Sequence, residues 1–389
     1  MPRFPAASPT SLGLSDRVYS DLVRKAQGRP GPLYSLHVGD TYRDPPQAAW
    51  AEAHTVEDHP RLHNYAPVQG EPVLLKAIVD RLHARYGTWV DREHVQVMCG
   101  ATAGFNVVCS TILDPGDEVI LLSPFWPLIR GIVTSRGAMA VEVPFFDRMG
   151  EAAFDPEQAI EVAISPRTVA LYVNTPNNPT GKVIAPRVRD AIAKIVLRHD
   201  LWLLCDEAYE EITFGDGTVQ PLWARADLHT HAIALHTFSK SYGMAGARVG
   251  YAHGPASVMG AVRSVQTFLT YCAPRPMQFA ALRALEEGEE WLEETRGLYR
   301  EAALASATAL NVATPEGGTF VFFDASPYLR ADEPIMKLLE RCLDVGVLLT
   351  PGGASGKHYE RWARLCFTAV PPDALEDALG RLRTVLVRP

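Results

Sequence analysis

The fold of this 389-residue chain is constrained most by a series of short apolar runs that alternate with stretches of helical pattern. The runs cover residues 95–99, 118–122, 169–173, 201–205, 232–235 and 249–252. Runs of this kind are typical of strands in a mostly parallel sheet that helices cover on both faces. Between the runs, residues 72–86 place apolar side chains at positions 74, 75, 78 and 82, which predicts an amphipathic helix. The chain is therefore predicted to be an α/β protein.

The pattern changes after residue 280, which indicates a second unit. Residues 282–307 form a long charged amphipathic stretch that predicts a connecting helix. A smaller α+β unit follows, with strands expected near residues 319–324, 347–349 and 364–368. The chain is also longer than one hydrophobic core usually supports. We therefore predict an N-terminal arm and segment (1–44) packing on the small domain, a large domain (45–281) and a small domain (282–389). The first ten residues, rich in Pro, Ser and Ala, are expected to form a loose arm.

Polar residues gather just beyond the carboxyl ends of several apolar runs. These polar residues lie at positions 174–181 and 206–209 and at Ser239, Lys240 and Arg248. Open α/β sheets bind their ligands at this edge. Asp206 directly follows five apolar residues, so its carboxylate is expected to be buried and paired; the alternative is the N-cap of a helix. Lys240 alone would be read as a solvated surface lysine, because lysine is rarely buried.

Three segments in register carry a resemblance to a known family. Residues 237–251 (TFSKSYGMAGARVGY), 177–181 (NNPTG) and 206–209 (DEAY) resemble the core signatures of the class I and II aminotransferases. These are fold-type-I enzymes that depend on pyridoxal 5′-phosphate, and the likeness extends from about residue 39 to residue 364. It implies a large domain with a mostly parallel sheet of the seven-stranded type, a smaller α+β domain, and transfer of an amino group from an amino acid to a 2-oxo acid.

The resemblance assigns catalytic roles to Lys240, Asp206 and Tyr209, and a cofactor contact to Asn178. It implies that Lys240 forms the Schiff base with the cofactor aldehyde and moves the α-proton of the substrate. An amine can do this only if its pKa is lowered. Asp206 is implied to pair with the pyridine nitrogen of the cofactor, which keeps the ring an electron sink. Asn178 and Tyr209 are implied as donors to the phenolic oxygen, and their alternatives are an Asn-Pro turn and a packed core tyrosine.

The phosphate of the cofactor needs backbone N–H groups and cations. Residues 100–104 (GATAG) lie between a strand and a helical stretch, where amides can point at an anion. The resemblance assigns the phosphate to Ala101, Thr102, Thr237 and Arg248. It also matches Trp126 to the aromatic residue that stacks on the cofactor ring; a core tryptophan is the alternative. Arg248 could otherwise lie on the surface, but the flanking Gly246 and Gly250 suit a tight, partly buried setting.

Substrate recognition and assembly also follow from the resemblance. Arg364 is matched to the arginine that binds the substrate α-carboxylate, a contact that suits the planar guanidinium fork. Arg361 competes for this role, although the apolar residues after Arg364 favour Arg364 as the strand residue that faces the site. Gly39 is matched to a glycine whose backbone closes over the substrate, where Asn178 also contributes. Tyr65 is matched to the tyrosine that reaches the phosphate in the neighbouring subunit, which implies a homodimer with shared active sites.

The sequence departs from the family pattern where members that act on aspartate and glutamate carry a second arginine. That arginine lies a few residues before a Tyr-x-x-Pro-like stretch. The comparable residues 268–274 are apolar and contain no arginine, and Arg275 lies on the far side of Pro274. We therefore expect an apolar or aromatic substrate side chain rather than a dicarboxylic one. Other reactions with the same cofactor, such as β-elimination, cyclisation or oxidation, and a non-catalytic binding role remain alternatives.

Composition excludes several classes of partner. The formal net charge of −8 argues against nucleic acid or an anionic membrane, since both need a basic face. The apolar runs are far shorter than the roughly 20 residues of a membrane span. The six cysteines form no C-x-x-C pair, and no H-E-x-x-H motif or Cys/His cluster suggests a metal. Without an apolar signal core at the N-terminus, a cytoplasmic protein is expected.

Overall fold

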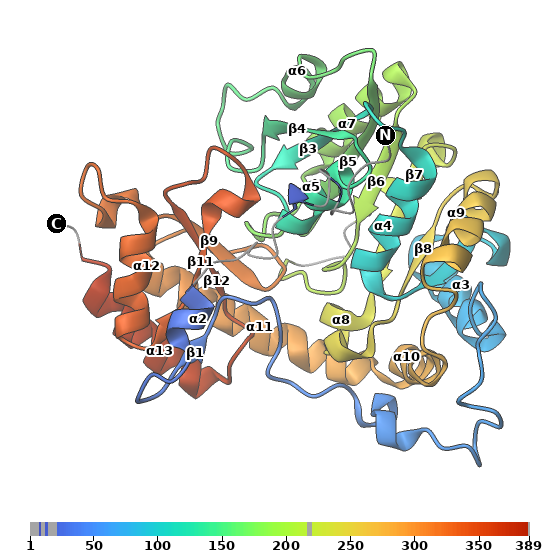
Figure 1. Ribbon diagram of the computed structural model, residues 1–389, viewed down its shortest axis with the longest axis horizontal. Coiled ribbons are helices and arrows are strands. Elements are labelled where there is room, and N and C mark those ends of the chain that lie inside the picture. Colours follow the sequence, from blue (N-terminus) through green and yellow to red (C-terminus); the bar gives the residue numbers. More distant parts are fainter. Residues whose placement is uncertain (1–7, 9–11, 15–21, 216–219, 388–389) are drawn as a thin grey trace, which may run out of the picture.

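A sheet of seven strands forms the centre of the larger part of the molecule (Figure 1). The computed structural model describes residues 8, 12–14, 22–215 and 220–387. Within them the strand order is β2-β8-β7-β6-β5-β3-β4. The bounds are β2 (Val95–Met98), β3 (Glu118–Ser123), β4 (Met139–Pro144), β5 (Thr168–Asn174), β6 (Trp202–Asp206), β7 (Ala232–Thr237) and β8 (Gly250–His253). β8 is antiparallel to both neighbours and the other adjacent pairs are parallel, which confirms the mostly parallel sheet.

The six apolar runs correspond to six of these strands, and β4 was not expected. β4 pairs only with β3 and forms one edge of the sheet. Its residues are mostly half-buried, and only Val143 is fully buried. The sequence of an edge strand exposed in this way lacks the continuous apolar run by which the central strands were recognised.

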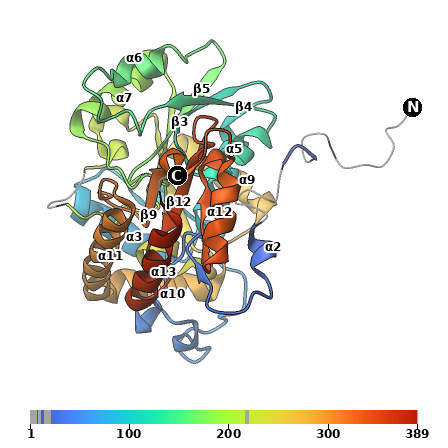
Figure 2. The ribbon, with the colours of Figure 1, turned by 90° about the vertical axis from the view of Figure 1, so that its left-hand side faces the viewer.

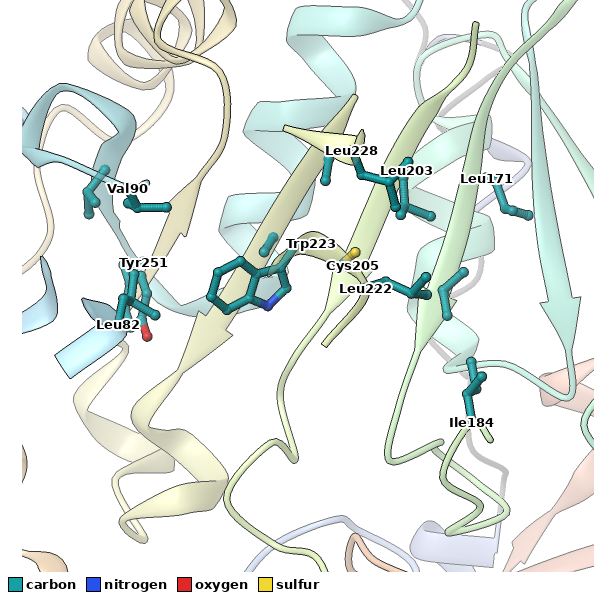
Figure 3. Close-up of a cluster of buried hydrophobic side chains, with 14 of the residues drawn as sticks. Leu82, Val90, Leu171, Ile184, Leu203, Cys205, Leu222, Trp223, Leu228 and Tyr251 are labelled. Atoms are coloured by element: carbon teal, nitrogen blue, oxygen red, sulfur yellow. The ribbon is translucent and has the colours of Figure 1, made fainter. Parts of the chain in front are cut away.

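Helices cover both faces of the large sheet, as expected. One face packs against α4 (Gly100–Ile112), α5 (Pro127–Thr134) and α9 (Ala256–Leu269). The other packs against α3 (Pro72–Tyr86), α6 (Pro156–Glu161), α7 (Pro186–His199) and α10 (Arg275–Glu287). Successive strand residues point to opposite faces of the sheet. Leu203 and Cys205 therefore pack in the hydrophobic cluster on the α3, α6, α7 and α10 face (Figure 3), whereas Leu204 packs in the cluster on the α4, α5 and α9 face. Each fully buried Leu, Ile or Val contributes about 1.5–3 kcal/mol.

A smaller α+β unit lies beside the large sheet. Its sheet has the order β11-β12-β9, with β9 (Phe320–Asp324), β11 (Thr350–Pro351) and β12 (Trp362–Cys366). Figure 2 shows α11 (Glu289–Leu310), α12 (Ile335–Asp344) and α13 (Pro372–Val385) packed together on it. From the N-terminal segment, α2 (Leu22–Ala26) contacts α12, and β1 (Tyr34–Ser35) pairs with β10 (Val347–Leu348). The domain boundaries at residues 45 and 282 stay a prediction, and the N-terminal arm lies, apart from Ser8, outside the described residues.

The connecting helix expected over 282–307 is instead divided between two helices. α10 ends at Glu287, α11 begins at Glu289, and Gly288 separates them. A Cβ atom at Gly288 would lie 2.3 Å from the carbonyl oxygen of Ala284 and 2.8 Å from the ring of Tyr242. Glycine thus permits a close approach of backbone and ring at this junction. The charge and apolar pattern continue across it, so periodicity alone did not reveal the break.

Other features of the described residues bear on what the chain can bind. No helix in them is both long and apolar enough to cross a membrane. Among the same residues, no group of three or more His, Cys, Asp or Glu side chains could hold a metal ion. All six cysteines are free thiols.

Candidate active site

A cavity of about 220 Å³ opens at the carboxyl ends of β5, β6 and β7, where these strands face the smaller unit. It is lined by Val38, Gly39, Ala101, Thr102, Trp126, Leu128, Asn174, Asn178, Asp206, Ala208, Tyr209, Thr237, Ser239, Lys240, Ala245, Arg248, Phe320 and Arg364. All of the predicted site residues except Tyr65 are in this set. Three distant sequence motifs therefore meet at one sheet edge, as the position of polar residues after the strands predicts.

Lys240 lies in α8 (Phe238–Ser241), a single turn that begins directly after β7. The side chain of Thr237 caps this turn by accepting from the backbone N–H of Ser239. The Lys240 Nζ atom donates to the carbonyl oxygen of Gly39, which also lines the cavity. Burial lowers the pKa of Lys240, and the charges of Arg364 and Arg248 lower it further. The surface role considered for an isolated lysine is therefore wrong.

Asp206 is the last residue of β6 and is almost completely buried. Its Oδ2 atom accepts from the hydroxyl of Tyr172 at 2.5 Å, and its Oδ1 atom accepts from the backbone N–H of Ala208 at 3.1 Å. Burial raises the pKa of Asp206 to about 6, although both hydrogen bonds act to lower it. The residues after Asp206 form a turn and not a helix, so the helix N-cap considered for it is wrong.

Asn178, Tyr209 and Arg364 form a hydrogen-bonded group between the two units. Arg364, on β12, donates through Nη1 to Asn178 Oδ1 at 3.0 Å and through Nη2 to the carbonyl oxygen of His37 at 2.9 Å. The Nδ2 atom of Asn178 donates in turn to the Tyr209 hydroxyl at 3.4 Å. The guanidinium carbon lies 4.3 Å from the centroid of the Phe320 ring. The two hydrogen bonds and the Phe320 ring together hold the guanidinium in one orientation.

Arg361, the competitor for the carboxylate-binding role, lies outside the cavity. Its guanidinium donates to Ser326 Oγ at 3.2 Å and to the carbonyl oxygen of Glu333 at 3.0 Å. Arg361 therefore binds a loop of the smaller unit. The structure places Arg364, and not Arg361, in the cavity.

Backbone amides, hydroxyl groups and a guanidinium converge at the start of α4. Ala101 and Thr102 lie in its first turn, whose N–H groups have no partner within the helix. Arg248 donates to the carbonyl oxygen of Ala245 at 2.9 Å and to Ser239 Oγ at 3.4 Å. A Cβ atom on Gly100 would lie 2.6 Å from Arg248 Nη2, so glycine at this positive φ keeps space for the guanidinium. The cluster suits a phosphate dianion.

Known proteins of one family match this chain over nearly its whole length. The family model for aminotransferase class I and II matches residues 32–382. The chain belongs to this family. It is similar to the aspartate/prephenate aminotransferase of Thermus thermophilus, with 35% identity over 384 residues that cover 95% of this chain and 92% of the relative. It is also similar to the arginine–pyruvate transaminase of Pseudomonas aeruginosa, with 34% identity, 87% of this chain and 86% of the relative.

Solved structures show the same family likeness. The aspartate aminotransferase from Thermus thermophilus with maleate superimposes with a TM-score of 0.88 at 31% identity, covering 98% of this chain and 100% of that chain. Class I and II aminotransferases depend on pyridoxal 5′-phosphate, so this chain is a pyridoxal-phosphate-dependent aminotransferase. The fold and activity expected from the sequence are thereby confirmed.

The donor set of this aminotransferase fits its cofactor. The cavity offers the amides of α4 with Thr237 and Arg248 for a phosphate, and a buried carboxylate, Asp206, for a ring nitrogen. Lys240 lines the same cavity, and burial lowers its pKa. Trp126, at the N-cap of α5, is half-buried on the cavity wall, and Phe105 packs beside it with ring centroids 6.2 Å apart.

Tyr65 stands apart from the cavity of its own chain. Its side chain is 82% exposed, and its ring contacts that of Tyr271 with centroids 5.0 Å apart. Its proposed reach into a neighbouring subunit stays a prediction.

The sequence assigned no role to several residues that line the cavity. Ser239 stands among the polar residues beyond the strand ends and inside the lysine motif, but the motif gave it no part in the site. Val38, Leu128 and Phe320 come from three separate segments. No local pattern distinguishes such apolar wall residues from core residues, because only the packing of the two units brings them to one cavity.

Proposed function

We propose that this aminotransferase moves the amino group of an L-amino acid with an apolar or aromatic side chain to a 2-oxo acid. The observation that carries the proposal is the charge of the cavity wall. Lys240, Arg248 and Arg364 are its cationic residues among those the structure describes, and each has a task in binding the cofactor or an α-carboxylate. Val38, Leu128 and Phe320 supply apolar surface beside them.

Each side chain of the cavity has a defined part in the proposed reaction. When bound, pyridoxal 5′-phosphate supplies the electron sink that makes the α-proton of an amino acid acidic. Lys240 anchors the cofactor and moves that proton, because its lowered pKa favours the neutral amine. Asp206 holds the ring nitrogen protonated, and Asn178 and Tyr209 hold the phenolic oxygen. Arg364 orients the substrate through its α-carboxylate, and Gly39 closes the backbone over it.

The remaining contacts position the cofactor within the cavity. Ala101, Thr102, Thr237 and Arg248 would hold the phosphate. The Ser239 hydroxyl, which accepts from Arg248 and lines the cavity, would join this group. Trp126 would stack on the ring. Apolar walls exclude water from the reacting atoms, which strengthens the electrostatic contacts among the charged groups.

A panel of amino acids tests the proposal. Enzyme loaded with cofactor is mixed with phenylalanine, leucine or aspartate without any 2-oxo acid, and the conversion of the cofactor to its pyridoxamine form is followed by absorbance. We expect phenylalanine and leucine to convert it, with kcat/KM at least about tenfold above that for aspartate, because a second carboxylate would lie unpaired against apolar walls. Ammonia release with the aldehyde form retained would indicate another reaction, and a preference for aspartate would refute the substrate class.

We also propose a homodimer formed through an exposed apolar patch, defined as Tyr65, Phe268, Leu269 and Tyr271. Phe268 is 90% exposed and Leu269 is 51% exposed, next to the Tyr65–Tyr271 ring pair. Contiguous exposed apolar side chains of this kind mark protein interfaces. Pairing of two copies there would cover the patch and carry Tyr65 toward the phosphate site of the partner.

Replacing Phe268 by aspartate should dissociate this dimer, because a charge would have to be buried in an apolar contact. We expect light scattering after size-exclusion chromatography to show the wild type at twice the mass of the chain and Phe268→Asp at the mass of one chain. Leu304→Asp, on α11 and 57% exposed, is the matched control and should stay dimeric. A dimeric Phe268→Asp protein would contradict the assignment of the patch.

A further inference from the structure

Tyr172 directly contacts the carboxylate of the proposed cofactor-binding aspartate, although it does not line the cavity. It lies on β5, where Asn174 pairs in register with Asp206 of β6 and Tyr172 pairs with Leu204. Since strand side chains alternate, Tyr172 and Asp206 point to the same face of the sheet. The Tyr172 hydroxyl donates to Asp206 Oδ2 at 2.5 Å, and both side chains are almost completely buried.

The packing around Tyr172 holds its hydroxyl in place. Its ring meets that of Phe105 edge-to-face with centroids 5.4 Å apart, and Phe105 also packs beside Trp126 on the cavity wall. Burial and the nearby charge of Asp206 raise the pKa of Tyr172 well above its ordinary value. The hydroxyl therefore stays protonated and serves as a fixed donor.

A fixed donor changes the balance between the two forms of Asp206. Burial favours the neutral acid, whereas hydrogen bonds to the carboxylate favour the charged form. Asp206 receives two such bonds, one from Tyr172 and one from the backbone of Ala208. The bond from Ala208 comes from its backbone N–H and does not depend on a side chain. The bond from the Tyr172 hydroxyl can be removed by substituting Tyr172.

We propose that Tyr172 is a positioning residue that keeps Asp206 ionised and in one orientation, ready to pair with the pyridine nitrogen of the cofactor. This inference rests on the proposed role of Asp206 in binding that nitrogen. Tyr172 would thus affect the reaction only through Asp206, and would itself touch neither the cofactor nor the substrate.

Removal of the hydroxyl in Tyr172→Phe tests this inference. The full chain, freed of cofactor by dialysis, is titrated with pyridoxal 5′-phosphate between pH 5.5 and 8.5, and binding is followed by quenching of protein fluorescence. We expect the pH at which affinity falls with Asp206 protonation to rise by about one unit, the size of one hydrogen bond to a charged group. Because burial places the pKa of Asp206 at about 6, cofactor affinity should then weaken about eightfold at pH 5.5 and only about twofold at pH 7.

A second buried tyrosine provides the matched control. The Tyr359 hydroxyl donates to Asp147 Oδ1 at 2.8 Å, and neither residue lines the cavity. Tyr359→Phe removes the same kind of bond and should leave the pH profile of cofactor binding unchanged. Equal shifts in Tyr172→Phe and Tyr359→Phe would show a general structural effect and would overturn the inference.

An Asp206→Asn background separates this inference from the function on which it rests. If Tyr172 acts through Asp206, Tyr172→Phe adds no further loss of cofactor affinity once Asp206 is replaced. In the cofactor-free chain, the pH dependence of the melting temperature relative to Asp206→Asn reports the ionisation of Asp206. An unchanged midpoint in Tyr172→Phe would overturn the inference. A shifted midpoint without a change in cofactor affinity would support it and would instead contradict the proposed role of Asp206.

Discussion

Replacing Lys240 by alanine should lower the rate of amino-group transfer by about 10⁴-fold, the upper range for loss of a positioned acid–base group. Lys240 is the one lysine that lines the cavity within the described residues. The other cationic side chains of the cavity, Arg248 and Arg364, carry a guanidinium and no amine that could anchor the cofactor.

The measurement is the rate of pyridoxamine formation from phenylalanine, together with the imine absorbance of the loaded enzyme, which should disappear in Lys240→Ala. Lys182→Ala is the matched control, because Lys182 is also partly buried and donates to the carbonyl oxygen of Phe146 at 2.7 Å outside the cavity. It should keep both the absorbance and the rate. Persistence of the imine band in Lys240→Ala would refute the assignment of Lys240 as the residue that anchors the cofactor.

The second large effect is expected for Asp206→Asn, which should lower kcat by about 10²- to 10⁴-fold. Removing one partner of a buried ion pair costs about 3–5 kcal/mol. The amide cannot carry the negative charge that holds the ring nitrogen protonated. Asp147→Asn, at the carboxylate that accepts from Tyr359, is the control and should retain wild-type kcat. A wild-type rate in Asp206→Asn would contradict the assigned role.

In the cofactor-free chain, we expect Asp206→Asn to raise the stability of the fold, although it lowers kcat in the loaded enzyme. Burial raises the pKa of Asp206 from its ordinary value of 3.8 to about 6, so between these values the folded chain binds more protons than the unfolded chain. The free energy of unfolding therefore falls as the pH rises from about 4 to 6, by about 3 kcal/mol for two pKa units. Above pH 6, Asp206→Asn should melt higher than the wild type when both lack cofactor. Parallel melting profiles of the two proteins across this range would contradict the raised pKa.

Prediction from the sequence succeeded where local chemistry carries the information. The lysine motif, the Asn-Asn-Pro-Thr-Gly loop and Asp206 each follow an apolar strand, so their meeting at one sheet edge follows from parallel strand order alone. β4 was missed because an exposed edge strand has no continuous apolar run, and the break at Gly288 was missed because amphipathic periodicity continues across it.

By itself the sequence determined the family and the cofactor and predicted the side chains of the site, because these are residue types at set positions after strands and within motifs. Only the tertiary structure decided which of Arg361 and Arg364 enters the cavity, that Val38, Leu128 and Phe320 line it, and that Tyr172 donates a hydrogen bond to Asp206. Those relations join residues from different strands and from both units. Their distances depend on how the large sheet packs against the smaller unit, and no spacing along the chain encodes that packing.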